Sequence, residues 1–244
     1  MIGNGCVMVI GGNEDKRGAR ESILGQFVRR AGGDDARIVI IPSASAEPVK
    51  RAARYARIFN RLKAAEVRAV HAERVISEED REAIRNATGI FVTGGSQANL
   101  MQALRANDLV ELIRATVQNG AVYAGTSAGA SAASETMIAG STRKKGTELV
   151  EYGEGLGLIP DVIIDQHFAE RRRLSRLIEA AKAQQLTGVG IDENTALVWN
   201  RDGVLTVEGA GEVTIVDADR RSMEPKARAF RLTILRPGAK FVAD

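Results

Sequence analysis

The chain has few cysteines, histidines and aromatic residues for its 244 residues, and each scarcity excludes a class of site. A single cysteine, Cys6, rules out an intrachain disulfide, which fits a reducing cytoplasm, and its place in the first apolar run indicates a small core residue. The two histidines, His71 and His167, lie far apart in the sequence and make a poor zinc site. We therefore expect neither a metal nor another cofactor.

The chain also lacks a long apolar run. No segment approaches the roughly 20 apolar residues that cross a bilayer, so we expect no membrane partner. The amino terminus has no basic region, and the charged residues 14–17 follow its short apolar run, so no signal peptide is predicted. The prolines are scattered, and no linker or repeat is visible. We predict one cytoplasmic domain over residues 1–244.

The charge balance gives little support for a polyanionic partner. The sequence pI is near 9.2, yet 34 basic residues face 31 acidic ones, which leaves a net charge of only +3. Aromatic residues make up 4% of the chain and do not interleave with the basic stretches, so a base-stacking surface is not indicated. A solvated helix face explains the arginines of residues 49–65. We expect no nucleic-acid partner.

Short β-branched runs alternate with segments of helical period, a pattern typical of parallel strands joined by crossover helices. After Thr187 short strands follow one another across tight turns, which predicts an antiparallel or mixed extension that finishes the sheet. The predicted fold is α/β, a mostly parallel sheet with helices on both faces. The strands predicted before Thr187 are Val7–Ile10, Arg37–Ile41, Val67–Val70, Ile90–Thr93, Ala121–Ala124 and Val162–Asp165.

One of these strands ends in the pentapeptide Gly-Thr-Ser-Ala-Gly, residues 125–129. Small residues on both sides of a serine allow a sharp turn from strand to helix that exposes its hydroxyl, as in a nucleophile elbow. The pattern predicts Ser127 as a nucleophile and the Ala128 amide, at a helix N-terminus, as a donor to an oxyanion. A small-residue helix start packed on the sheet is the alternative, and Ser131 is the next candidate nucleophile.

A hydrolytic serine needs a general base, and the chain offers only His71 and His167. Both follow predicted strands, where α/β sheets collect their ligand chemistry. His167 is favoured because Glu193, after the apolar run 189–191, is available to orient its imidazole. Asp192 is the rival acid. A hydrogen-bonded strand-end histidine and a capping or solvated acid remain the structural alternatives.

Glycines end two further strands. Gly11-Gly12 belongs to neither a dinucleotide nor a Walker pattern, so we interpret it as a tight turn. Gly94-Gly95 allows a backbone N–H to face a substrate carbonyl without an intervening side chain. Gln97 then either binds substrate or begins a helix.

An arginine cluster follows His167. On a predicted helix, Arg173 and Arg176 share one face while Arg172 points off it. Guanidinium groups that face a pocket grip carboxylates bidentately. A solvated basic helix is the alternative.

The order Ser, His, Glu differs from that of α/β-hydrolases and matches the class I glutamine amidotransferase-like fold. The chain resembles cyanophycinases, serine peptidases of the clan of aspartyl dipeptidase (peptidase E). The resemblance rests on residues 9–16, 91–101, 123–134, 165–177 and 190–197. It implies Ser127 as nucleophile, His167 as general base and acid, Glu193 as orienting carboxylate, and Gly95 with Ala128 as the oxyanion pair.

The resemblance extends to substrate binding. The cyanophycinase pattern D-Q-H-F-x-x-R-x-R-x-x-R matches residues 165–176 at every fixed position and is not expected in relatives that resemble peptidase E. It implies that substrate is bound by Gln166, Arg171, Arg173 and Arg176, and Gln97, two residues after Gly95, is a further candidate from its position alone.

The implied substrate is cyanophycin, a poly-aspartate with arginine on its β-carboxyls, and its β-Asp-Arg oligomers. The implied activity is exo-acting hydrolysis of backbone Asp-Asp bonds that releases β-Asp-Arg, by a homodimer. Glu14 and Asp15 either accept the substrate guanidinium or pair with Lys16 and Arg17. An aspartyl dipeptidase, another serine peptidase of the clan and a non-catalytic binding module are the competing interpretations.

Overall fold

The computed structural model of the chain describes residues 5–144, 147–218 and 230–242. An eight-stranded sheet forms its centre, in the order β14-β11-β10-β1-β5-β4-β2-β3. The five strands from β1 to β3 in that order run parallel to their neighbours, and the other three pair antiparallel. Their bounds are β1 Cys6–Ile10, β2 Arg37–Ile41, β3 Glu66–Ala69, β4 Gly89–Val92, β5 Val122–Thr126, β10 Thr195–Trp199, β11 Val204–Gly209 and β14 Lys240–Val242.

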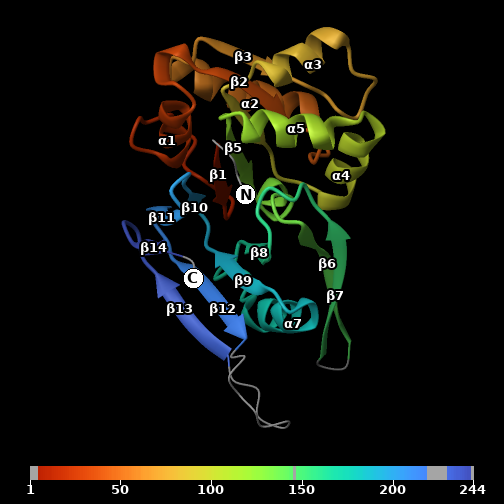
Figure 1. Cartoon of the computed structure of the whole chain (residues 1–244), viewed down its shortest axis with the longest axis vertical. Helices are drawn as coiled ribbons and strands as arrows, with labels where there is room; N and C mark the ends of the chain where they lie inside the picture. Colours follow the sequence, from red (N-terminus) through yellow and green to blue (C-terminus); the bar gives the residue numbers. More distant parts are fainter. Residues whose placement is uncertain (1–4, 145–146, 219–229, 243–244) are drawn as a thin grey trace.

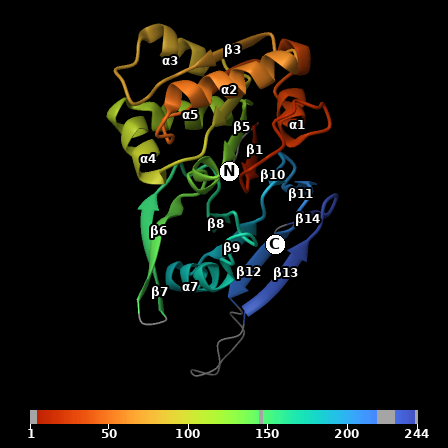
Figure 2. The same ribbon diagram turned by 180° about the vertical axis from the view of Figure 1, so that it is seen from behind.

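Helices cover both faces of this sheet, because side chains along its strands alternate between two apolar clusters. In β1, Met8 and Ile10 pack with α1 and α2, while Val7 and Val9 pack with α3, α4 and α5. Helix α5 lies in front of the sheet in Figure 1, and α2 lies in front in Figure 2, which shows the molecule from behind. The helices span α1 Ile23–Arg30, α2 Pro48–Arg61, α3 Glu78–Arg85, α4 Gln97–Ala106 and α5 Leu109–Gln118, with a 3-10 turn at Gly33–Asp35.

A second sheet of four strands lies in the other half of the molecule, in the order β13-β12-β9-β8 (Figure 1). Helix α7 packs on it through Leu177, Ala180 and Ala181. An antiparallel hairpin, β6 with β7, stands beside α7. The bounds are β6 Thr136–Lys144, β7 Thr147–Glu154, β8 Val162–Gln166, α7 Leu174–Gln184, β9 Thr187–Ile191, β12 Val213–Ala218 and β13 Phe230–Leu235, and the short helix α6 spans Ala128–Ser131.

The predicted α/β class is confirmed, and all six predicted strands exist with bounds shifted by at most two residues. The predicted antiparallel or mixed extension after Thr187 is confirmed, but only part of it finishes the large sheet. Strands β10, β11 and β14 join the large sheet, whereas β9, β12 and β13 form the second sheet with the predicted strand at 162–165. Asn194, at a left-handed φ of 49°, lies in the bend where the chain crosses between sheets. Alternating apolar and polar residues identify a strand but not the strand with which it pairs. The β6–β7 hairpin was not predicted.

Candidate active site

Ser127 lies on a sharp turn between β5 and α6, with φ 53° and ψ −109°. A side chain rarely adopts this conformation, and its persistence indicates that the surrounding structure enforces it. The flanking glycines are required because backbone passes directly against them. A Cβ at Gly125 would lie 2.2 Å from the Gly129 carbonyl oxygen, and a Cβ at Gly129 would lie 2.5 Å from that of Val92. The turn therefore has the geometry of the predicted elbow.

The structure brings the predicted serine, histidine and glutamate into one chain of hydrogen bonds. Ser127 Oγ lies 2.9 Å from His167 Nε2, and His167 Nδ1 lies 2.7 Å from Glu193 Oε1. Because a carboxylate only accepts, Nδ1 carries the proton and the Nε2 lone pair faces the serine hydroxyl. Asn13 Nδ2 donates to Glu193 Oε2 at 2.9 Å and holds the other carboxylate oxygen.

The environment of Glu193 favours its charged form. Desolvation opposes ionisation, but hydrogen bonds from His167 and Asn13, with the nearby charges of His167 and Arg171, lower the pKa of Glu193 below the ordinary glutamate value. The group beside the imidazole is therefore a carboxylate at neutral pH, and it stabilises positive charge on His167.

The loop after β1 connects the three strand ends that carry these residues. The amides of Ser127, His167 and Asn194 donate to the carbonyl oxygens of Ile10, Gly11 and Gly12 at 2.9, 2.8 and 2.8 Å, respectively. Because one short segment accepts all three bonds, the relative positions of nucleophile, base and acid are set by the backbone.

Gly12 in that loop has a role that its sequence context does not reveal. Its φ is 102°, and a Cβ there would lie 2.3 Å from His167 Cε1. The interpretation of Gly11-Gly12 as a tight turn is incomplete, since Gly12 also makes room for the imidazole. In the sequence, only its position just after a buried strand indicates that Gly12 lies near the site.

The rival residues have other partners. The Asp192 carboxylate accepts from the amides of Ala169 and Glu212, at 3.1 and 3.0 Å, and so ties two loops together. His71 pairs with Glu73, Nδ1 to Oε1, at 2.9 Å. Ser131 is buried and donates to the Ile164 carbonyl oxygen at 3.3 Å.

Gly95 and Ala128 are the residues predicted to bind an oxyanion. Ala128 is the first residue of α6, and Gly95 lines the same cleft as Ser127. Neither backbone amide donates a hydrogen bond to another residue within 5–144, 147–218 and 230–242. Only glycine fits at position 95, because its φ is 150° and a Cβ would lie 1.9 Å from the Ala44 carbonyl oxygen. Gln97 begins α4 and donates to the Ile138 carbonyl oxygen of β6 at 3.1 Å.

The serine opens into a cleft of about 680 Å³ whose walls are strongly cationic. Two carboxylates of the lining, Glu14 and Glu193, face a larger set of positive side chains. The basic side chains of the lining are Lys16, Arg51, Arg54, Arg171, Arg173 and Arg176.

The arginines after His167 do not share a helix, so that prediction is wrong. Helix α7 begins at Leu174, and Arg171 to Arg173 form turns before it. Positive φ values at His167 and Arg172, 51° and 52°, interrupt the helix there. Arg171, Arg173 and Arg176 nevertheless line the cleft, whereas the exposed Arg172 is not among its lining residues.

Two of these arginines already hold a buried acid. Asp165 accepts from Arg173 Nη1 at 3.1 Å and from Arg176 Nε at 2.8 Å. Burial first, then the charges of Arg176 and Arg171, lower the pKa of Arg173 to about 10 against the opposing effect of Asp165. Arg173 also donates to the buried Gln166 side chain. This network pre-orients two guanidinium groups, while Arg171 has no ion-pair partner among the described residues.

Glu14 and Asp15 are both engaged within the chain. The buried Glu14 carboxylate accepts from Tyr55 and from Thr126 Oγ1, the latter at 2.6 Å, and pairs with Lys16 at 3.2 Å. Desolvation opposes ionisation, but Lys16 and the two hydroxyl groups lower the pKa of Glu14. Asp15 pairs with Arg17 at 3.1 Å. The geometry agrees with the salt-bridge alternative for both acids.

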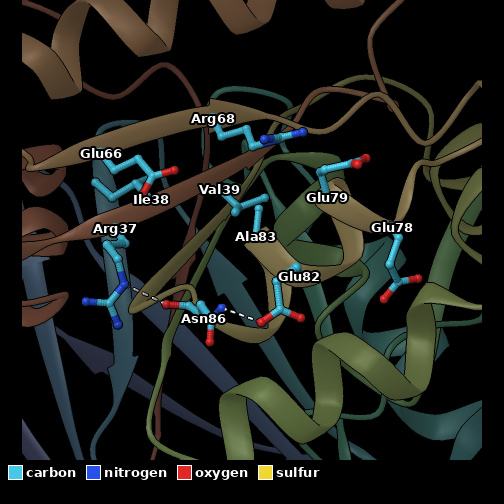
Figure 3. Close-up of a pocket in the computed structure, with 10 residues that line it drawn as sticks. All are labelled: Arg37, Ile38, Val39, Glu66, Arg68, Glu78, Glu79, Glu82, Ala83 and Asn86. Atoms are coloured by element: carbon cyan, nitrogen blue, oxygen red, sulfur yellow. Dashed lines mark hydrogen bonds between the residues drawn. The ribbon is translucent and has the colours of Figure 1, made fainter.

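A second groove, of about 460 Å³, lies between β2, β3 and α3 (Figure 3). Its lining contains neither serine nor histidine, and Arg37 in it donates to the Asn86 carbonyl oxygen at 2.9 Å. Across the described part of the chain, no cluster of three or more His, Cys, Asp and Glu side chains has metal-binding geometry. No helix in that part is long and apolar enough to cross a membrane.

The chain is similar to known peptidases in sequence and in fold. Residues 7–207 match the sequence profile of peptidase family S51. A cyanophycinase of Trichormus variabilis is 44% identical over 253 residues, covering 97% of this chain and 85% of that protein. A peptidase E of Shewanella sp. is 30% identical over 155 residues, covering 58% and 62%.

Among solved structures, a peptidase from an acI-B1 Actinobacterium has the same fold, with a TM-score of 0.70, 22% identity, and coverage of 98% of this chain and 97% of that one. The predicted resemblance to cyanophycinases and the prediction of a serine-type peptidase are confirmed. The chain belongs to peptidase family S51.

Proposed function

We propose that the protein is a serine peptidase that hydrolyses backbone Asp-Asp bonds of cyanophycin from a chain end and releases β-Asp-Arg dipeptides. One observation carries this proposal: the hydrogen-bond chain of Ser127, His167 and Glu193 lies in a cleft that is also lined by arginines. These are Arg171, Arg173 and Arg176. Relatives named cyanophycinase, about 44% identical over most of the chain, support the proposal.

The geometry supports an acyl-enzyme mechanism. His167 Nε2 takes the hydroxyl proton of Ser127 as Oγ attacks the Asp-Asp carbonyl carbon. The amides of Gly95 and Ala128 donate to the oxyanion, and Glu193 stabilises the imidazolium. His167 then protonates the leaving amine as the C–N bond breaks. Water next gives a proton to His167 and attacks the ester, and Ser127 regains its proton when the acid leaves.

The cationic cleft suits the charges of this substrate. Every β-Asp-Arg unit has a carboxylate on its arginine, and the terminal unit has another at its backbone end. Arg171 is free to bind one, and Arg173 and Arg176 share a single compensating charge on Asp165, so the group retains net positive charge. Gln97 and Gln166 provide polar contacts in the same lining.

Product analysis tests this proposal. The purified protein is incubated with insoluble cyanophycin, and the soluble products are identified by mass. β-Asp-Arg as the first and main product is expected; longer fragments appearing first would contradict exo-cleavage. Ser127→Ala serves as the inactive control.

An aspartyl dipeptidase is the second candidate, and it has weaker support because peptidase E relatives match only 58% of the chain. Cleavage of Asp-X dipeptides without attack on cyanophycin would favour it. We also propose a cytoplasmic homodimer. Light scattering after size exclusion is expected to give twice the 26.1 kDa chain mass.

A further inference from the structure

The five arginines of the cleft come from two parts of the molecule. Arg171, Arg173 and Arg176 belong to the segment from β8 to α7, in the half of the molecule with the second sheet (Figure 1). Arg51 and Arg54 belong to α2, which covers the large sheet in the other half. The motif after His167 identifies only the first of these two walls of the cleft.

The α2 wall is joined directly to the nucleophile turn. Tyr55 donates its hydroxyl proton to Glu14, which accepts from Thr126 Oγ1 through its other oxygen at 2.6 Å. Thr126 immediately precedes Ser127. Arg51 lies one helical turn before Tyr55 and Arg54 is adjacent to it, so both lie on a wall anchored beside the reacting hydroxyl.

The arginines of α2 have fewer acidic partners than the arginines that follow His167. Glu14 is neutralised by Lys16 at 3.2 Å. The guanidinium groups of Arg51 and Arg54 have no ion-pair or hydrogen-bond partner among the described residues, whereas those of Arg173 and Arg176 share Asp165. Burial and Glu14 raise the pKa of Tyr55, and the charges of Arg51 and Arg54 oppose that rise, which agrees with guanidinium groups near its hydroxyl. Two unpaired guanidinium groups in a cleft form a binding site for a carboxylate.

We propose that Arg51 and Arg54 form a second carboxylate-binding subsite, separate from Arg171, Arg173 and Arg176, so that substrate is held by carboxylates on both walls. This inference rests on the proposed function. A dimer of β-Asp-Arg has one scissile backbone bond and three carboxylates: two on its arginines and one at its backbone end. The subsite binds one of these, and selects substrates with carboxylates on both walls.

The test compares Arg51→Gln/Arg54→Gln with Arg57→Gln. Arg57 is exposed on the same helix and is absent from the cleft lining, so it is matched for charge and helix position. Substrates are the β-Asp-Arg dimer and three forms of it, each amidated at one of its three carboxylates. The double variant is expected to lose about tenfold or more in kcat/KM on the unmodified dimer, with Arg57→Gln unchanged.

Amidation identifies which carboxylate is bound. In the wild type, amidating the bound carboxylate lowers kcat/KM by a similar factor, and in the double variant the same amidation has no further effect. An equal amidation effect in both proteins, or an equal loss in Arg57→Gln, overturns the subsite. If the wild type does not cleave the unmodified dimer, the proposed function fails. Calorimetric binding of the dimer to Ser127→Ala, with and without the double substitution, then still decides the subsite.

Discussion

Two regions of this molecule each bring a serine, a histidine and a glutamate together, and they connect them differently. In the cleft, the His167 imidazole lies between Ser127 and Glu193. Beyond the ends of β2 and β3, the Glu73 carboxylate lies in the middle, 2.7 Å from Ser43 Oγ and 2.9 Å from His71 Nδ1. Only the first order lets an imidazole take a proton from a serine hydroxyl, because in the second the serine donates to an acid.

The two regions also differ in backbone conformation. Ser127 and His167 have positive φ values, 53° and 51°, whereas Ser43, His71 and Glu73 do not. Ser43 Oγ also accepts from the Ala72 amide at 2.9 Å and is buried, so it fastens a loop. Strain at the first cluster and satisfied hydrogen bonds at the second indicate reactivity in one place and stability in the other.

The two serines provide the largest expected contrast. Ser127→Ala removes the hydroxyl that faces the imidazole, so kcat is expected to fall on the order of 10³-fold or more. Ser43→Ala is expected to leave kcat at the wild-type value. Release of β-Asp-Arg from cyanophycin measures both, and equal activity of the two variants would remove Ser127 as nucleophile.

The two histidines extend the contrast. His167→Ala removes the proton acceptor, and we expect a loss in kcat similar to that of Ser127→Ala. His71→Ala removes only a partner of Glu73. Equal losses of kcat at the two positions would contradict the assignment of the base.

Gly12→Ala breaks the first cluster without changing its chemical groups. The new Cβ would lie 2.3 Å from His167 Cε1, so the imidazole must move, and a displacement of this kind costs on the order of 10²-fold in kcat. Gly18→Ala is the control, because Gly18 also has a positive φ, 77°, but its Cβ would meet only the flexible Arg61 side chain at 3.1 Å. Steady-state kinetics compares kcat of the two variants. Equal kcat values would show that strain at a positive-φ position, and not the contact with His167, causes the loss.

Arginines surround the first cluster, and Arg171 gives the cleanest test of their role. We expect Arg171→Ala to lower kcat/KM about tenfold or more with little change in thermal stability. Arg172→Ala, exposed and outside the cleft lining, should match the wild type. Arg173 and Arg176 are poorer choices, since their removal also leaves the buried Asp165 under-compensated and destabilises the fold.

The second cluster is expected to affect stability as a function of pH. Desolvation opposes ionisation of Glu73, but bonds from Ser43, its own backbone amide and His71 lower its pKa. A lowered folded-state pKa stabilises the protein above the unfolded value, about 4.3, and this contribution is lost as pH falls through the folded pKa. Glu73→Gln should lower the melting temperature by about 2–4 °C at pH 7. The difference from wild type should shrink below about pH 4; a constant difference would contradict the linkage.

The sequence predicts features that depend on neighbouring residues better than it predicts contacts between distant segments. The elbow at 125–129 and the strand ends at Ile10, Gln166 and Ile191 are local, because glycine and β-branched runs indicate where a strand must stop. The preference for Glu193 over Asp192 came from neighbouring residues alone. The structure brings Glu193 to the imidazole and turns Asp192 toward two backbone amides.

The sequence by itself determined the α/β class, the strand that carries Ser127, and the residue types for acyl transfer, since these depend on local pattern and composition. Only the tertiary structure decided that the imidazole of His167 lies between Ser127 and Glu193, that Gly12 makes room for it, and that α2 contributes arginines to the cleft. The physical reason is that these relations join segments at least 26 positions apart, through backbone hydrogen bonds and sheet pairing that no local pattern records.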